Sequence, residues 1–435
     1  MSRPPLPGGP YLVLGLARSG RAAAAALLAR GETVLGADRD PTRALAGVEL
    51  VDGLDALDRV RCVIKSPGVP REDAVVLAAR SRNIFLMGEL ELAWRLLAQD
   101  FVAVTGTNGK TTTVELLGAI HRAAGLGVAV AGNVGLAASG LAGTLAPEDV
   151  VVCEVSSFQL EDMVAFAPDA AALLNIAPDH LDRHGDMADY VAAKLSLFAH
   201  QGPQAIAVAP AGGPPAPGGA ERVTFGSAAD ADLRDDGVAL RWRGEPLIAG
   251  AEIRLRGLHN RENAMAAAAL ALARGIPERS VVESLATFPG VAHRLEEVAN
   301  AGGVLYINDS KATNTASTLV ALRAFEPGSV HLILGGRGPG QDFGVLREEV
   351  AARARAVYVI GEEAPAIAAA LSGQHPVDCG TLERAVDAAR AAAAPGEVVL
   401  LSPACKSFDQ FRDFEARGEA FRTLVRSEEA FRARR

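Results

Sequence analysis

The chain is 435 residues long, which is too long for one ordinary hydrophobic core and predicts two or three domains. Residues of the AVILMFWYC set make up 49% of the chain and charged residues 22%, a composition that excludes wholesale disorder. The net charge of −9, with 52 acidic against 43 basic residues, argues against non-specific binding to nucleic acid.

No apolar run approaches the ~20 residues that a membrane helix needs, and the N-terminus lacks an apolar signal core. The four cysteines lie far apart and form no C-x-x-C pair, which is typical of a reducing compartment and argues against a zinc site. We therefore expect a soluble, cytoplasmic protein that does not insert into membranes. As a separate expectation, the protein is a monomer. Four small core or near-site residues are expected at Cys62, Cys153, Cys379 and Cys405.

The first predicted elements form a βαβ unit. A strand at Tyr11–Leu14 is followed by a glycine turn, an alanine-rich helix to Arg30, and a second strand over 33–37 that ends at Asp38. Ala17 occupies the middle glycine position of a dinucleotide fingerprint, so NAD is a less suitable ligand than another nucleotide or a sugar nucleotide. Asp38 can accept a hydrogen bond from a ribose or a base. The alternative is a plain strand-helix turn with a solvated Asp38.

Residues 105–112, TGTNGKTT, form a glycine-punctuated turn between an apolar strand over 101–104 and a helix from Lys110. Free backbone N–H groups and the dipole at a helix N-terminus favour an anion there, and a lysine with a following threonine suits phosphates and Mg²⁺. The spacing G-x-x-G-K-T is two residues shorter than the common phosphate loop. A capped helix after a tight turn is the alternative.

Strands and helices alternate along the rest of the chain, which predicts parallel sheets covered by helices on both faces. The glycine- and proline-rich run 210–219 is expected to be an exposed loop, and 288–290 to mark a domain boundary. The fold class is therefore α/β, with three domains at 1–92, 93–290 and 291–435. Predicted strands lie at 62–65, 150–155, 171–176, 204–208, 303–307, 330–334, 356–360 and 397–401, and predicted helices at 89–97, 187–199, 260–274, 315–325, 344–353 and 382–394.

Three residues of the middle region have side chains suited to a metal or phosphate site. Glu154 ends an apolar strand, where an unpaired carboxylate is costly to bury, and a metal would explain it. His180 follows a strand in Asp179-His180, where a catalytic loop belongs, although a lone histidine is more often a surface residue. Lys194 lies among alanines on a predicted helix, and its alternative is a lysine whose head reaches water. Polar turns at 308–314 and 401–410 also follow strands, as ligand sites do, although capped helices explain them equally.

Taken in order, these motifs resemble the Mur ligases over nearly the whole chain. The motifs that carry the resemblance are TGTNGKTT, EVSSFQL, NIAPDHLDRH, AAKLSLF, LHNRENAMAA, GVAHRLE, NDSKATN and LSPACKSFDQF. The resemblance implies an N-terminal Rossmann-like UDP-binding domain, a central P-loop ATPase-like domain, and a C-terminal Rossmann-like domain that binds an amino acid. It further implies that ATP and two Mg²⁺ ions support the joining of D-glutamate to UDP-N-acetylmuramoyl-L-alanine in peptidoglycan synthesis, through an acyl phosphate.

The resemblance also implies a role for each matching residue. Lys110, His180 and Lys194 are the expected catalytic residues, and Lys194 resembles a lysine that CO₂ converts to a carbamate. Metal ligands are expected at Thr111, Glu154, His180 and Lys194. ATP contacts are expected at Gly106, Asn108, Gly109, Lys110, Thr111, Thr112, Asn263, Arg294, Asp309 and Lys311. UDP-substrate contacts are expected at Leu16, Ala17, Arg18, Asp38, Arg39, Ser66, Pro67, Gly68 and Asn133, and amino-acid contacts at Thr313, Ser407 and Phe414.

Pro339 departs from the family pattern, because the family usually has a lysine there that pairs with a glutamate carboxylate. An unpaired substrate carboxylate would bind much more weakly. We hypothesise a relocated cation, supplied by Arg337 or Lys406.

Two other interpretations remain open. One is another ligase of the same superfamily, with a different amino acid or similar to folylpolyglutamate synthase, although DSKATN argues against it. The other is a P-loop nucleotide switch, although no Asp-x-x-Gly switch motif is recognisable.

Overall fold

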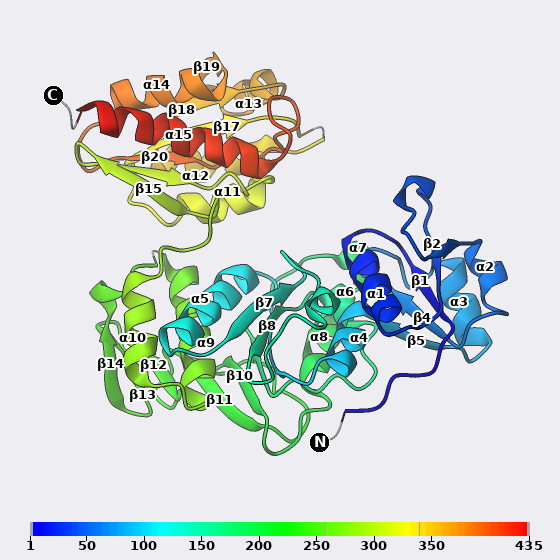
Figure 1. Ribbon diagram of the computed structural model, residues 1–435. Helices are drawn as coiled ribbons and strands as arrows, with labels where there is room; N and C mark the ends of the chain where they lie inside the picture. Colours follow the sequence, from blue (N-terminus) through cyan, green and yellow to red (C-terminus); the bar gives the residue numbers. More distant parts are fainter. Residues whose placement is uncertain (1–2, 256, 339, 433–435) are drawn as a thin grey trace. The chain divides into compact units, whose positions relative to one another are not determined.

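The computed structural model describes residues 3–255, 257–338 and 340–432, with side chains for all of these except 181, 182 and 428–432. The chain forms two compact units (Figure 1). The first contains the chain up to Arg254 together with His259–Phe288, and the second contains Leu255–Leu258 and the chain from Pro289. The second unit begins close to the predicted boundary at 290. Residue 92 lies inside the first unit, so the division into three domains stays a prediction.

The first unit contains two sheets. One is fully parallel, with the strand order β3-β2-β1-β4-β5. The order reverses between β1 and β4, and ligands of such sheets bind outside the carboxyl ends of the strands at this switch point. Its elements are β1 (Tyr11–Leu14), α1 (Arg18–Ala29), β2 (Val34–Ala37), β3 (Glu49–Leu50), α2 (Gly53–Ala56), β4 (Cys62–Lys65), α3 (Ala74–Ser81), β5 (Phe85–Gly88) and α4 (Glu89–Leu96).

The other sheet of this unit has nine strands in the order β14-β13-β12-β11-β10-β9-β6-β8-β7. Pairing is parallel from β7 to β12 and antiparallel between β12, β13 and β14. Its strands are β6 (Asp100–Thr105), β7 (Val128–Gly132), β8 (Val150–Glu154), β9 (Ala170–Leu173), β10 (Ile206–Pro210), β11 (Glu221–Gly226), β12 (Leu233–Asp235), β13 (Ala239–Trp242) and β14 (Glu245–Ala249). Its helices are α5 (Lys110–Ala123), α6 (Ser157–Leu160), α7 (Leu181–His184), α8 (Met187–Leu195), α9 (Leu258–Ala273) and α10 (Glu278–Thr287).

The second unit contains a six-stranded sheet in the order β15-β16-β20-β17-β18-β19. Only the edge pair β15–β16 is antiparallel, and the other pairs are parallel. Its elements are β15 (Glu296–Ala301), β16 (Val304–Asn308), α11 (Thr315–Leu322), β17 (Val330–Gly335), α12 (Arg347–Arg353), β18 (Ala354–Ile360), α13 (Ala364–Ala370), β19 (Val377–Gly380), α14 (Leu382–Ala392), β20 (Val398–Leu401) and α15 (Phe414–Arg432). The parallel α/β architecture predicted from the sequence is confirmed in both units.

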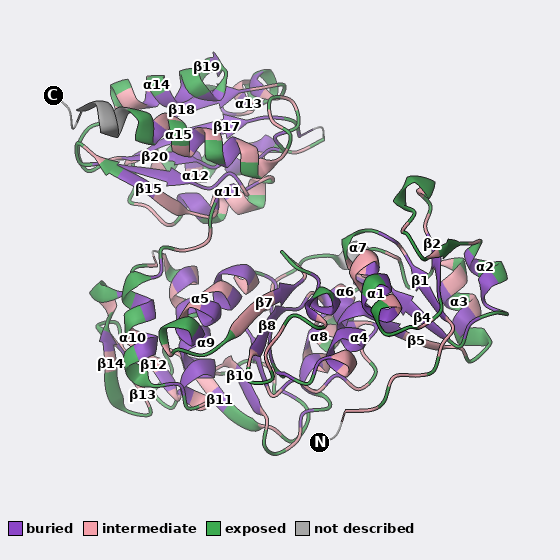
Figure 2. Ribbon diagram, viewed as in Figure 1, coloured by how far each residue is buried: buried purple, intermediate pink, exposed green. Residues whose placement is uncertain are grey.

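Figure 2 shows that the central strands of the sheets are buried and that most connections between elements are exposed. The run 210–219 is largely exposed, as expected, although Pro210 ends β10 and Ala216 is buried. All four cysteines are buried free thiols, which confirms their assignment as small interior residues. Among the described helices, none has the length and apolar composition required to span a membrane.

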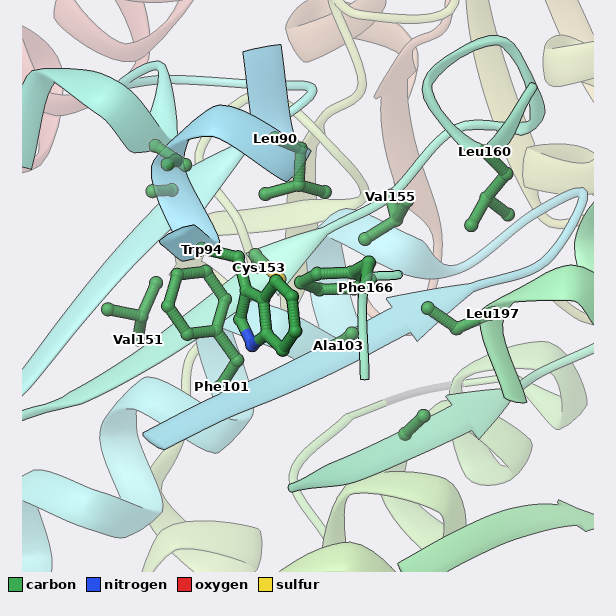
Figure 3. Packing of buried hydrophobic residues seen from close by; sticks show 14 of the residues in the cluster. Leu90, Trp94, Phe101, Ala103, Val151, Cys153, Val155, Leu160, Phe166 and Leu197 are labelled. Atoms are coloured by element: carbon green, nitrogen blue, oxygen red, sulfur yellow. The ribbon is translucent and has the colours of Figure 1, made fainter. Parts of the chain in front are cut away.

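A core cluster in the first unit joins α4 to the nine-stranded sheet (Figure 3). Trp94 of α4 and Phe101 of β6 both make edge-to-face contacts with Phe166, with ring centroids 5.8 and 5.9 Å apart. Since α4 directly follows β5, this cluster fixes the two sheets of the first unit to each other. A buried ion pair of 2.5 Å between Lys65 and Asp162 also links them.

We expect Phe166→Ala to lower the free energy of unfolding by about 3–5 kcal/mol, because the ring is fully buried and its loss leaves a cavity between two aromatic partners. Denaturant unfolding of the full chain measures this. The control is Val238→Ala, which removes an exposed side chain of the same unit and is expected to change stability by less than about 0.5 kcal/mol. Equal effects of the two variants would contradict the packing role of Phe166.

Candidate functional site

The turn between β6 and α5 has the backbone of a phosphate loop. Gly109 has a φ of 87°, and a Cβ at this residue would lie 1.9 Å from Oδ1 of Asn263. Gly106 also has a positive φ, and its Cβ would lie 2.9 Å from the Cβ of Leu174. Glycine is therefore required at both positions, and the N–H groups at the start of α5 are available to an anion. The predicted strand-turn-helix is confirmed.

Side chains from neighbouring segments hold this loop. Lys110 donates from Nζ to the carbonyl oxygens of Gly106 and Thr107, both at 2.8 Å, so its ammonium group lies over the turn. Asn175 accepts a 2.9 Å hydrogen bond from the backbone N–H of Asn108. The hydroxyl of Tyr190 lies 3.1 Å from Oγ1 of Thr107. The roles of Asn175 and Tyr190 were not predicted from the sequence, although Asn175 begins the polar run that follows β9.

Glu154 lies buried at the end of β8, as expected, and both of its carboxylate oxygens accept hydrogen bonds. Oε2 accepts from the hydroxyl of Thr111 at 2.8 Å, and Oε1 from the side-chain amide of Asn133 at 2.9 Å. The contact with Thr111 places one carboxylate and one hydroxyl beside the phosphate loop. Hard oxygen ligands of this kind suit Mg²⁺, which is usually bound by one or two carboxylates together with phosphates and water.

Lys194 is fully buried at the end of α8, so the alternative of a lysine reaching water is wrong. Its Nζ donates to the carbonyl oxygen of Gly106 at 2.9 Å and lies 4.5 Å from the centroid of the Tyr190 ring. Burial, and secondarily the charge of Lys110, lower the pKa of Lys194 to about 7. The amine is therefore half neutral at this pH and largely neutral above it, and the neutral form is a nucleophile.

His180 is half exposed, and its ring lies beside that of Phe158. Its ring centroid is 4.8 Å from that of Phe158, and its Nε2 lies 3.5 Å from a carboxylate oxygen of Asp179. No hydrogen bond joins His180 to Glu154 in the part of the chain that the structure describes. Within the same residues, no group of three or more His, Cys, Asp or Glu side chains is positioned to hold a metal by itself.

A cavity of about 790 Å³ opens at the switch point of the five-stranded sheet, between the ends of β1 and β4. Its volume is that of a typical small-molecule site. Eight of the nine predicted UDP-substrate residues line it, namely Ala17, Arg18, Asp38, Arg39, Ser66, Pro67, Gly68 and Asn133. Leu16 is buried beneath, and its N–H donates to Asp38 at 2.5 Å. Burial opposes ionisation of Asp38, but N–H donors from residues 40 and 16 outweigh it and hold its pKa below the usual value.

The polar turns of the second unit also come together. Asp309 is buried after β16, where Oδ2 accepts from Ser402 at 2.8 Å and Oδ1 from the N–H of Leu295 at 3.1 Å. Burial raises the pKa of Asp309 to about 7, although the Ser402 hydrogen bond opposes the shift. Beside this turn, Lys311 lies 6.0 Å from the centroid of the Phe414 ring, and Arg294 lies one residue before Leu295.

Arg417 is a buried residue that the sequence analysis missed. Its guanidinium donates to the hydroxyl and carbonyl of Ser310, both at 2.9 Å, and to the carbonyls of Cys405 and Gly335 at 3.0 and 3.4 Å. Burial lowers its pKa to about 10. It thereby ties together three loops, two of which precede the predicted amino-acid contacts Thr313 and Ser407. The sequence did contain a signal for this residue. Phe414, Arg417, Phe421 and Val425 recur at helical spacing, so Arg417 lies in the apolar stripe of a helix.

The loops that carry Arg337 and Lys406 form an antiparallel bridge, with reciprocal backbone hydrogen bonds of 2.8 and 2.9 Å. Arg337 makes a two-bond ion pair with Glu362, at 2.9 and 2.8 Å. The Lys406 side chain is exposed and follows directly on Cys405, next to the buried Ser407. Pro339, the departure from the family pattern, lies outside the described residues.

The sequence matches the family described as Mur ligase middle domain over residues 104–271, and the family described as Mur ligase, glutamate ligase domain over residues 293–405. Among curated relatives, the UDP-N-acetylmuramoylalanine--D-glutamate ligase of Anaeromyxobacter dehalogenans (strain 2CP-C) is 43% identical, over 98% of this chain and 99% of the relative. The protein of that name from Acidobacterium capsulatum is 40% identical, over 97% of this chain and 96% of the relative.

Two solved structures from Thermotoga maritima share the fold. The UDP-N-acetylmuramate-alanine ligase MurC has a TM-score of 0.60 at 19% identity, over 97% of this chain and 100% of that one. The MurF ligase in complex with ADP has a TM-score of 0.59 at 18% identity, over 97% of this chain and 96% of that one.

Proposed function

The chain belongs to the Mur ligase family, and from that premise we propose that it joins D-glutamate to UDP-N-acetylmuramoyl-L-alanine at the expense of ATP, in peptidoglycan synthesis. The observation that carries the chemistry is the buried Lys194, bonded to the carbonyl of Gly106 in a phosphate loop that also holds Lys110 and the Thr111–Glu154 pair. A buried amine with a pKa near 7 can combine with CO₂ to give an anionic carbamate. An anion at this position suits a ligase, because the enzyme must hold more than one cation around the phosphoryl group that is transferred.

The residues of the phosphate loop bind and orient ATP. N–H groups at the start of α5 receive the phosphates, and Lys110 moves from the loop carbonyls to the terminal phosphates. Thr111 and Glu154 would hold one Mg²⁺, and His180 with carbamylated Lys194 would hold a second. Carbamylation joins the neutral amine to CO₂ with loss of one proton, so a neutral group becomes an anion that can bind metal. When bound, Mg²⁺ neutralises charge on the transferring phosphoryl group.

The reaction requires activation of a carboxylate, which is a poor electrophile. The γ-phosphoryl group of ATP passes to an oxygen of the alanyl carboxylate, and ADP leaves. The amine nitrogen of D-glutamate then attacks the carbonyl carbon of this acyl phosphate, a C–N bond forms, and inorganic phosphate leaves. Exclusion of water protects the acyl phosphate from hydrolysis.

Binding roles are proposed for the remaining residues as the family pattern assigns them. The UDP group occupies the cavity at the β1–β4 switch point, against Asp38 and the Ser66–Gly68 turn. ATP contacts are Gly106, Asn108, Gly109, Thr112, Asn263, Arg294, Asp309 and Lys311, and amino-acid contacts are Thr313, Ser407 and Phe414. The domain limits 1–92, 93–290 and 291–435 belong to the same proposal, as do a cytoplasmic location and a monomeric state.

Release of ADP from the full chain tests this function. With Mg-ATP and UDP-N-acetylmuramoyl-L-alanine, we expect almost no ADP until D-glutamate is added, and no stimulation by L-glutamate. Stimulation by L-glutamate or another amino acid would move the assignment to a different ligase of the superfamily. Steady hydrolysis of ATP without either co-substrate would favour the nucleotide switch.

For the glutamate side-chain carboxylate, we expect Lys406 to supply the relocated cation, because Arg337 is already paired with Glu362. Lys406→Ala should raise the KM for D-glutamate about 10- to 100-fold, the range of a lost charge-assisted hydrogen bond. Its matched control is Arg337→Ala, on the paired loop, with a change of about threefold or less. ADP release at varied D-glutamate measures both. An unchanged KM in both variants would exclude a relocated cation at either position.

A further inference from the structure

A continuous series of hydrogen bonds joins the cavity of the five-stranded sheet to the phosphate loop. Arg18 donates from Nη2 to the carbonyl oxygen of Asn133 at 2.7 Å. The side chain of Asn133 donates to Oε1 of Glu154 at 2.9 Å, and the Thr111 hydroxyl donates to Oε2 at 2.8 Å. Four residues thus connect α1 to α5, and all four lie in the first unit.

The middle of this series is rigid. The backbone N–H of Asn133 donates to the carbonyl oxygen of Glu154 at 2.9 Å, so Asn133 is bonded to Glu154 through both backbone and side chain. Gly132 has a φ of 112°, and a Cβ there would lie 2.2 Å from the Glu154 carbonyl oxygen. Because the two segments are in such close contact, a displacement of Asn133 must move the Glu154 carboxylate.

Arg18 is the exposed end of the series. It lies at the start of α1, its side chain is exposed, and it lines the cavity together with Asn133. A ligand in this cavity therefore contacts the residue that holds the Asn133 carbonyl. An anionic ligand, such as the diphosphate of a UDP group, competes with that carbonyl for the guanidinium.

We propose that Arg18 is a positioning residue that couples occupation of the UDP cavity to nucleotide binding, by setting the position of Asn133 and, through it, of Glu154. The inference rests on the proposed function, since it takes a UDP-linked acceptor in the cavity and Mg-nucleotide at the loop. Coupling between two sites is reciprocal and appears as a change in the affinity of one ligand caused by the other.

Calorimetric titration of the full chain with Mg-ADP, with and without saturating UDP-N-acetylmuramoyl-L-alanine, tests the proposal. In the wild type we expect the acceptor to change the Kd for Mg-ADP about 5-fold or more. The measured quantity is the ratio of the two Kd values for Mg-ADP, without and with the acceptor. In Arg18→Met this ratio should fall to within about twofold of one. Arg18→Gln is the second variant, with the same expectation, and melting curves confirm that both are folded.

Arg39→Met is the matched control, because Arg39 lines the same cavity but pairs with Asp73 at 3.3 Å. It should weaken acceptor binding and, with the acceptor raised to saturation, keep the wild-type ratio. An unchanged ratio in both Arg18 variants would overturn the proposal, as would a ratio of one in a wild type that binds both ligands. A wild type that binds both ligands but forms no product with D-glutamate would instead overturn the proposed function.

Discussion

Replacement of Lys194 by methionine is expected to lower kcat for ADP release by at least about 100- to 1000-fold, the cost of removing one charge-stabilising group from a transition state. The methionine fills similar volume, so the buried site should stay packed. Lys194→Arg should lose as much activity, since a guanidinium keeps its proton and forms no carbamate. Initial rates at saturating substrates measure this, and melting curves show whether the variants are folded. Wild-type kcat in either variant would exclude a catalytic role for Lys194.

The pKa of about 7 predicts a pH dependence for the proposed carbamate that can be observed without turnover. Only the neutral amine combines with CO₂, so a carbamate signal from ¹³C-bicarbonate should be present above pH about 7 and disappear as the pH falls below it. The signal should be absent from Lys194→Met. A signal of equal strength in the variant would assign the carbamate to another amine.

Stability provides a second check in buffer free of CO₂. The pKa of Lys194 is about 7 when folded against the ordinary 10.5, so between these pH values only the unfolded chain binds the proton. The free energy of unfolding of the wild type, relative to Lys194→Met, should therefore rise with pH from 7 to 10.5. Below pH 7 both states carry the charge, and the difference should be constant. A difference that does not change with pH would show that Lys194 keeps an ordinary pKa.

Local sequence patterns predicted the phosphate loop, because its strand, glycine turn and helix are adjacent in the chain and Gly109 has a conformation that glycine adopts readily. They did not predict the burial of Lys194. Its helical neighbours are alanines, which suit either face of a helix, and the burial depends on the distant Gly106 carbonyl. Resemblance to the family supplied the proposed role of Lys194 as a carbamylated lysine, and the structure shows the burial that lowers its pKa.

Local residue patterns could not predict the contacts of three residues, Arg417, Asn175 and Tyr190. Arg417 contacts Ser310 across 107 positions, and Asn175 contacts Asn108 across 67. Such contacts depend on how parallel strands are ordered in the sheet, which no local window encodes. The antiparallel β15–β16 pair was also missed, since the sequence analysis treated every strand of the third domain as part of an alternating β/α series.

Gly109→Ala is expected to weaken binding of ATP and ADP about 10- to 100-fold, a cost of ~1–3 kcal/mol for an overpacked and strained position. The added Cβ would lie 1.9 Å from Oδ1 of Asn263, and φ is 87°. Asn263 is buried and its amide donates to Asn260 at 3.3 Å, so it cannot give way without breaking a contact. The variant therefore distorts the phosphate loop and displaces a predicted ATP contact together. Calorimetric titration with Mg-ADP measures the loss.

Gly125→Ala separates the two causes, because Gly125 follows the other end of α5 with a φ of 73° and open space around its Cβ. Both variants bear the cost of a left-handed alanine, roughly 1–2 kcal/mol of stability, but only Gly109→Ala collides with a neighbour. Nucleotide affinity should therefore be unchanged in Gly125→Ala. Equal nucleotide affinity in the two variants would show that close packing of the loop against Asn263 is not required for binding.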